Sequence, residues 1–148
     1  MTTTVAFDIG GVIVNKISRV PYNESLISIK LYVEKLKPSN VYILSKAKNK
    51  WIKNNLELFD KIDFYNKTGI IPENVIFVDE YIDKQTVCNK LGINYMIDDS
   101  IKVIRYMQYI DTIPIWFGNN NLLVENLTYI NAPKWKSIRK ILQKISKN

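Results

Sequence analysis

The chain of 148 residues contains no histidine and a single cysteine, Cys88. An internal disulfide is therefore impossible, and zinc sites, Ser-His-Asp triads and Cys-His dyads are excluded because the residues that build them are missing. Any bound metal must be a hard cation held by oxygen atoms of Asp, Glu or the backbone. Apolar runs are short as well, whereas a membrane-spanning helix needs about 20 consecutive apolar residues.

The N-terminal residues 1–4 contain no basic region followed by an apolar stretch, so they do not read as a signal peptide. We therefore predict a soluble, cytoplasmic protein with no membrane partner. Acidic residues are fewer than basic ones, 14 against 21, and the net charge is +7. This charge favours an anionic partner, but the abundance of lysine, isoleucine and asparagine throughout the chain explains it more simply as a compositional bias.

The length suits a single domain, 1–148, and a hydrophobic content of 47% is sufficient for a core. Short apolar segments alternate with segments of helical periodicity. We expect strands at 3–7, 41–44, 75–78, 94–97 and 113–117. We expect one helix that is capped by Asn23 or Ser25 and ends before Pro38, a second that follows Ser45 and includes 51–59, and further helices from about 83 to 91, from the cap Ser100 to about 107, and from near 133 onward. This alternation predicts an α/β fold, a three-layer sandwich with a central, mainly parallel, Rossmann-like sheet.

Three details of this pattern are open to a structural check. The strand at 113–117 is expected at an edge of the sheet because it contains Pro114. The helix before residue 60 has Trp51, Ile52, Leu56 and Phe59 on one apolar face, and residues 60–73 are expected to be a connector. The last helix is expected to turn its apolar residues, starting with Trp135, toward the core.

Polar residues directly follow three of the expected strands. Asp8 follows the first strand, Ser45 the second, and the pair Asp98-Asp99 the fourth. Ligands of such sheets bind beyond the carboxyl ends of the strands, so these side chains share the edge where a site forms. Each feature alone has another explanation, since aspartates also start turns and stabilise helix N-termini. Together, three carboxylates at one edge would repel one another without a cation, which favours a metal site.

The motifs at these positions resemble those of the haloacid dehalogenase superfamily. Segment 5–13 (VAFDIGGVI) resembles the first motif, in which an aspartate ends the first strand before a glycine-containing turn. Segments 43–45 (ILS), 83–84 (DK) and 96–99 (MIDD) resemble the second, third and fourth motifs. Segment 83–100 is similar to the corresponding part of small nucleotidase-like and polynucleotide-phosphatase-like members.

The resemblance implies a phosphoryl-transfer site. Asp8 would be the nucleophile that forms an aspartyl-phosphate. Ser45 would donate a hydrogen bond to a phosphoryl oxygen, and Lys84 would neutralise the carboxylate and the phosphate. The backbone N–H groups of the turn containing Gly10 and Gly11 would add further donors to the phosphate.

The resemblance also implies a bound Mg²⁺. Its ligands would be the Asp8 carboxylate, the main-chain carbonyl of Gly10, and one of Asp98 and Asp99, with the choice between these two left open. Family phosphatases carry a second aspartate, a general acid and base, two residues after the nucleophile, and here that position is Gly10. Losing such a group lowers the rate by about 10² to 10⁴. The chain is then a slow phosphatase, a phosphoryl-binding pseudoenzyme, or an enzyme in which the substrate or another residue supplies the proton.

The segments between the motifs are too short for a sizeable cap domain, so the site is expected to be open to large substrates. With the positive net charge, this favours a phosphorylated substrate such as a nucleotide or a nucleic-acid end. Tyr22, Trp51, Tyr65 and Tyr81 are candidates for stacking bases, although they are more simply packing residues.

Several other phosphate-binding classes are excluded. The sequence has neither G-x-G-x-x-G nor the Gly-Lys-Ser/Thr of a P-loop. A receiver domain of the CheY type needs its acidic pair early and its lysine late, the reverse of the order here. Two function classes stay open: a Mg²⁺-dependent phosphohydrolase, and a catalytically silent domain that binds a phosphorylated or nucleic-acid partner.

Overall fold

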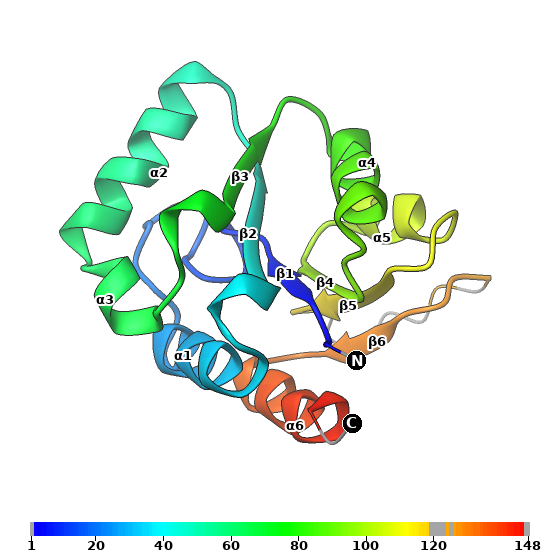
Figure 1. The fold of residues 1–148 in the computed structure, drawn as a ribbon. Helices are drawn as coiled ribbons and strands as arrows, with labels where there is room; N and C mark the ends of the chain where they lie inside the picture. The colour runs from blue at the N-terminus through cyan, green and yellow to red at the C-terminus, as the bar shows by residue number, and fades with distance from the viewer. Residues whose placement is uncertain (1, 119–123, 125, 147–148) are drawn as a thin grey trace.

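The computed structural model describes residues 2–118, 124 and 126–146, and it shows a six-stranded sheet with helices on both faces (Figure 1). The strands are β1 (Val5–Phe7), β2 (Val41–Lys46), β3 (Val75–Val78), β4 (Tyr95–Asp98), β5 (Ile113–Phe117) and β6 (Ile130–Ala132). The helices are α1 (Ser25–Leu36), α2 (Asn49–Lys61), α3 (Phe64–Thr68), α4 (Tyr81–Leu91), α5 (Ile101–Met107) and α6 (Trp135–Ile145), and short 3₁₀ turns at Pro38–Asn40 and Pro72–Asn74 precede β2 and β3.

The strands lie in the order β3-β2-β1-β4-β5-β6, and every neighbouring pair is parallel. The predicted three-layer α/β architecture is therefore confirmed. The chain builds outward from β1 to β3 and then returns to the other side of β1 to start β4. The winding direction thus reverses between β1 and β4, and in open α/β sheets ligands bind at the carboxyl side of such a reversal.

Two hydrophobic clusters fill the space between the layers. The larger cluster packs α1, α2, α3 and α6 against one face of the sheet, and the smaller one packs α4 and α5 against the other (Figure 1). The strands between them carry continuous apolar residues because both faces are covered. Burial on both faces explains why β1, β2 and β4 could be recognised from short apolar runs alone.

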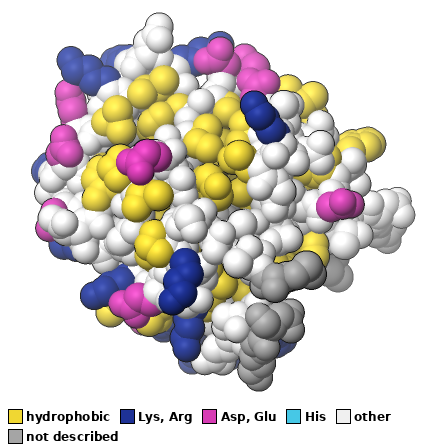
Figure 2. All heavy atoms as spheres, viewed as in Figure 1, with side chains coloured by type: hydrophobic (Ala, Val, Ile, Leu, Met, Phe, Trp, Pro, Cys, Tyr) yellow, Lys and Arg dark blue, Asp and Glu magenta, His cyan; other side chains and the backbone are white. Residues whose placement is uncertain are grey.

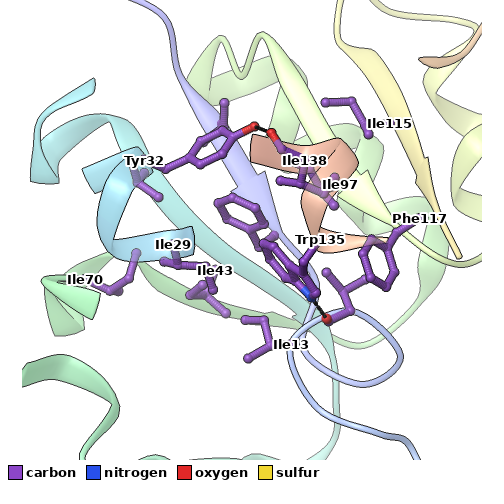
Figure 3. Close-up of a cluster of buried hydrophobic side chains, with 14 of the residues drawn as sticks. Ile13, Ile29, Tyr32, Ile43, Ile70, Ile97, Ile115, Phe117, Trp135 and Ile138 are labelled. Atoms are coloured by element: carbon purple, nitrogen blue, oxygen red, sulfur yellow. Dashed lines mark hydrogen bonds between the residues drawn. The ribbon is translucent and has the colours of Figure 1, made fainter. Parts of the chain in front are cut away.

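Two buried polar groups tie α6 to the rest of the large cluster (Figure 3). The Trp135 indole Nε1 donates a 2.9 Å hydrogen bond to the Val12 carbonyl, and the Tyr32 hydroxyl donates a 2.6 Å bond to the Ile138 carbonyl. The Trp135 ring also stacks on Phe7 of β1, with 5.7 Å between ring centroids. The predicted inward position of Trp135 is confirmed, and through Val12 this residue fixes the loop that follows β1.

The position predicted for β5 is wrong, because β5 pairs with β4 on one side and with β6 on the other. Pro114 lies opposite Met96 of β4, whereas pairing with β6 begins only at Ile115. The missing N–H of the proline therefore falls outside the stretch that β6 pairs with. β6 itself has three residues and too little apolar pattern to be recognised from the sequence.

The apolar face assigned to α2 is partly wrong. Trp51 is 52% exposed and Leu56 is 41% exposed, while Asn55 and Phe59 are buried. The buried side of α2 therefore includes the polar residue Asn55, and Trp51 lies outside it and lines a pocket. The expected connector at 60–73 also contains a helix, α3.

Helix α4 begins two residues earlier than expected, and a capping box explains the difference. Glu80 is the N-cap residue, and its backbone N–H donates a 2.9 Å hydrogen bond to the Asp83 carboxylate. Asp83 is therefore the third residue of the helix and not its start. This cap places the next residue, Lys84, in the first turn of α4.

The surface shown in Figure 2 has hydrophobic side chains near its middle and charged side chains around its margin. Basic and acidic side chains are both scattered over this face, so its described part carries no continuous basic patch. Among the described residues, no helix has the length and apolar character needed to cross a membrane.

Candidate active site

Three carboxylates from two neighbouring strands meet at the carboxyl edge of the sheet. Asp8 directly follows β1, Asp98 ends β4 and Asp99 follows it, and the two strands pair in parallel with Phe7 opposite Ile97. The pairing places the three side chains together, and one oxygen from each lies within 4.8 Å of the others. Asp98 is fully buried, and Asp8 is only 8% exposed.

Lys84 lies between two of these carboxylates. Its Nζ is 2.7 Å from Asp98 Oδ2 and 3.1 Å from Asp8 Oδ1, and its side chain is 1% exposed. Burial alone lowers the pKa of Lys84, but the negative charges of Asp98 and Asp8 outweigh burial and raise this pKa above its usual value. Lys84 is therefore a buried cation that compensates part, but not all, of the acidic charge.

Burial and the neighbouring negative charge both affect the pKa values of the acidic pair. Burial, followed by the charge of Asp8, raises the pKa of Asp98 to about 7, although Lys84 and the Ser100 N–H oppose this shift. The Ser100 N–H donates a 2.9 Å hydrogen bond to Asp98 Oδ1. Burial likewise raises the pKa of Asp99. Both aspartates are held in positions where their ionised forms need more positive charge than the protein supplies.

Lys16, on the loop after β1, partly supplies this charge. Its Nζ is 2.8 Å from Asp99 Oδ2, and this hydrogen bond raises the pKa of Lys16. Close packing at the same point requires a glycine at position 11. Gly11 has a φ of +86°, and a Cβ there would overlap the Asp99 carboxylate and approach Lys16 Cε to 2.8 Å. The turn after β1 can therefore approach the acidic pair only without a side chain at Gly11.

A pocket of about 160 Å³ opens beside the carboxylates. Ser45, which is 5% exposed in β2, lines this pocket with Asp8, Gly10 and Lys84. The structure thus brings Asp8 and all but one of the residues assigned to phosphate binding to one cavity. The other residues that line this pocket are Lys16, Arg19, Lys46, Trp51, Asn55, Tyr81, Asp99 and Ser100.

A larger hollow of about 970 Å³ adjoins this pocket, since Lys16 and Asp99 line both. Gly11, which the sequence assigned to phosphate binding, lines this larger hollow and not the smaller pocket. The role assigned to the Gly11 N–H stays a prediction.

The carboxylate cluster suits a hard divalent cation. All the candidate ligand atoms are oxygens, the donor type that Mg²⁺ and Ca²⁺ prefer. The three oxygens lie close enough to share one ion, and buried carboxylates with raised pKa values gain most from an added positive charge. The metal contact assigned to the Gly10 carbonyl stays a prediction.

Sequence comparison adds no family, because no family model and no curated protein sequence match this chain. Solved structures do match it. The D,D-heptose 1,7-bisphosphate phosphatase of B. bronchiseptica, complexed with magnesium and phosphate, superimposes with a TM-score of 0.68 at 9% identity, over 97% of this chain and 99% of that chain. The same phosphatase from Burkholderia thailandensis gives a TM-score of 0.64 at 12% identity, over 99% and 100%.

A HAD phosphatase from Thermococcus onnurineus gives a TM-score of 0.57 at 15% identity, over 95% of this chain and 98% of that chain. The chain has the haloacid dehalogenase fold. The strand order also excludes a receiver domain, in which the order is 2-1-3-4-5.

Position 10 in this haloacid dehalogenase fold has room for a side chain. A Cβ at Gly10 would lie 3.5 Å from Arg19 Nη1 and 3.6 Å from Lys16 Cγ, which are ordinary contacts. Neither the backbone nor the packing therefore demands glycine here, in contrast to Gly11. The lack of a carboxylate at this point is a chemical property of the pocket, not a consequence of a crowded turn.

The sequence did not indicate the cationic wall of this pocket. Lys16, Arg19 and Lys46 lie on loops or strand ends, where one lysine or arginine looks like any other. Asn55 could not be recognised as a pocket residue because it lies among the apolar residues of its helix. Its spacing of four residues from Trp51 puts both on one side of α2, and this spacing was the only local signal that they share a site.

Proposed function

We propose that the chain is a Mg²⁺-dependent phosphohydrolase whose nucleophile is Asp8. The observation that carries this proposal is the buried Asp8 carboxylate, which lies 3.1 Å from Lys84 and within reach of a cation shared with Asp98 and Asp99. The superimposed heptose bisphosphate phosphatase, which has the same fold, was solved with magnesium and phosphate. This likeness supports the choice of metal and of reaction.

Each residue has a role that follows from its position. A bound Mg²⁺ supplies the positive charge that allows a carboxylate to approach an anionic phosphoryl group. An oxygen of Asp8 bonds to phosphorus while the bond from phosphorus to the leaving oxygen breaks, which gives an aspartyl-phosphate and an alkoxide. Lys84 orients Asp8, and Ser45 donates a hydrogen bond to a phosphoryl oxygen. Water then cleaves the aspartyl-phosphate, which releases phosphate and restores Asp8.

The alkoxide must gain a proton, and Gly10 cannot provide one. Only Asp8 and Asp99 among the described residues that line the pocket are acidic, and Asp99 is paired with Lys16. We therefore expect slow turnover that depends on the leaving group. This feature also supports the second candidate function, a silent domain that binds a phosphorylated partner.

The two candidates are separated by activity measurements. Wild type, Asp8→Asn and the exposed control Asp60→Asn are assayed with small phosphomonoesters, nucleotides and 3′- or 5′-phosphorylated oligonucleotides, with Mg²⁺ or EDTA. We expect release of phosphate by wild type and Asp60→Asn only, and none in EDTA. Activity that survives both Asp8→Asn and EDTA contradicts the proposal, whereas tight binding without turnover favours the silent domain.

A further variant tests the role assigned to position 10. Gly10→Asp introduces a carboxylate where a Cβ makes ordinary contacts. We expect a rate increase of about ten-fold or more toward small phosphomonoesters, because general acid catalysis contributes about 10² to 10⁴. No increase, in a variant that is folded and binds Mg²⁺, would contradict this role.

A further inference from the structure

We propose that Arg19 binds a second phosphate group of the substrate, so that the pocket prefers substrates with two phosphates to those with one. This inference rests on the proposed function of the same pocket and narrows its substrate class. It is carried by the loop that positions Arg19, by the two side chains that hold its guanidinium, and by the charges around the pocket.

The loop at residues 15–20 is closed by Asn15. The side-chain Oδ1 of Asn15 accepts hydrogen bonds from the N–H groups of Ile17 at 2.8 Å and Ser18 at 3.0 Å. The main-chain carbonyl of Asn15 accepts a third hydrogen bond, from the Arg19 N–H at 3.0 Å. Arg19 has a φ of +62°, an unfavourable backbone conformation for a residue with a side chain. The hydrogen bonds of the loop thus hold the Arg19 backbone in this conformation, and the Arg19 side chain lines the pocket.

Two residues of α2 hold the guanidinium. Arg19 Nη2 donates a hydrogen bond to the Oδ1 of Asn55, which is 4% exposed, and the guanidinium carbon lies 5.7 Å from the centroid of the Trp51 ring. The other terminal nitrogen, Nη1, is 3.5 Å from the point where a Cβ of Gly10 would lie. The guanidinium, which lines the pocket, therefore lies between α2 and the turn that follows Asp8.

Among the described residues, Arg19 forms no ion pair, although the charge of Asp8 acts on it from a distance. Lys84 is paired with Asp8 and Asp98, and Lys16 is paired with Asp99. No carboxylate of the described residues pairs with Arg19, which has N–H donors beyond the one bonded to Asn55. A guanidinium with spare donors in a pocket is suited to bind an anion through two parallel hydrogen bonds.

The aromatic rings of the pocket support an anionic ligand and not a base. The guanidinium of Arg19 lies over the Trp51 ring. The ammonium groups of Lys46 and Lys102 lie over the Tyr81 ring, 4.6 Å and 5.7 Å from its centroid. These rings hold cations in place. Lys46, which lines the same pocket as Arg19, therefore adds a second positive charge that no carboxylate of the described residues pairs with.

The test measures binding, so it does not depend on turnover. The background is Asp8→Asn with Mg²⁺, and calorimetry compares fructose 1,6-bisphosphate with fructose 6-phosphate, and a 5′-phosphorylated dinucleotide with the 5′-mononucleotide. The first pair represents a second phosphomonoester and the second pair a phosphodiester. Arg19→Met and Arg19→Lys are added to this background, with Arg105→Met as the control, because Arg105 is exposed on α5 and lies outside the pocket.

In the Asp8→Asn background, we expect the ligand with two phosphates to bind more tightly than its partner in at least one pair. Arg19→Met should reduce this difference in affinity by about ten-fold or more, because a hydrogen bond between charged groups contributes a factor of that order. Arg19→Lys should restore part of it and Arg105→Met should not change it. The pair that responds identifies the source of the second phosphate. Equal losses for both members of each pair, or no preference in the Asp8→Asn background, overturn the inference. Failure of the proposed function is seen separately, as wild-type activity that survives Asp8→Asn and EDTA.

Discussion

Replacing Lys84 by methionine tests the electrostatic argument for the site most directly. Lys84 is 1% exposed and lies 2.7 Å from Asp98 and 3.1 Å from Asp8. Methionine keeps most of the volume but removes the charge, so two buried carboxylates face each other without their shared cation. Removing one partner of a buried ion pair costs about 3–5 kcal/mol. For a domain of this size, the cost corresponds to a fall in melting temperature of roughly 10 °C or more.

The loss should also depend on pH, with a sign that follows from Asp98. The folded pKa of Asp98 is about 7, above the usual 3.8, so the folded state binds its proton more tightly than the unfolded state does. Stability from this group is present at low pH and is lost as the pH rises from about 4 through 7. Without Lys84 the folded pKa rises further, so Lys84→Met should be more destabilising at pH 8 than at pH 5.

The assay is thermal and urea unfolding of wild type and Lys84→Met at both pH values, with and without Mg²⁺. Lys90→Met, on the exposed side of the same helix, is the matched control and should change the free energy of unfolding by less than about 1 kcal/mol. Mg²⁺ should recover part of the loss in Lys84→Met because it restores positive charge beside Asp98. A loss below about 1 kcal/mol, or a loss that is the same at pH 5 and pH 8, would refute the electrostatic argument.

Three further predictions follow from the same contacts. Mg²⁺ should raise the melting temperature of wild type more at pH 8 than at pH 5, because Asp98, a candidate ligand with a pKa of about 7, is ionised at pH 8 and mostly protonated at pH 5; an equal rise at both values would count against metal binding at this cluster. Gly11→Ala should weaken Mg²⁺ binding in calorimetry and lower stability by about 1 kcal/mol or more, because its Cβ overlaps the Asp99 carboxylate, whereas Gly92→Ala, with no neighbour near its Cβ, should leave Mg²⁺ affinity unchanged. Trp135→Phe should cost about 1–3 kcal/mol in urea unfolding, because the Val12 carbonyl loses its buried donor; an unchanged midpoint would show that this hydrogen bond contributes nothing.

Much of the architecture was already determined by the sequence. A strand covered on both faces must be apolar throughout, so β1, β2 and β4 are marked by composition alone. The residue after such a strand must lie at the sheet edge, and strands that are joined by helices run parallel. The arrival of Asp8 and Asp98 at one edge therefore required no knowledge of tertiary contacts.

The sequence failed where the outcome depended on partners far away in the chain. Pro114 predicted an edge strand, but β5 is internal because β6 pairs only beyond the proline. Trp51 has the spacing of a core residue, yet it packs against Arg19 at the pocket because Asn55 takes the buried position on α2. Periodicity indicates which face of a helix or strand is apolar, but it does not indicate which residues of other elements pack against that face.

The sequence by itself determined the α/β class and the gathering of acidic residues at one edge of the sheet. Only the tertiary structure decided that Lys84 is buried between two of them and that Lys16 pairs with a third. It alone also decided that Arg19 has no acidic partner among the described residues. The physical reason is that secondary structure follows from local burial, repeated every few residues. The pairing of charges depends instead on distances of a few ångströms between loops that local patterns do not place.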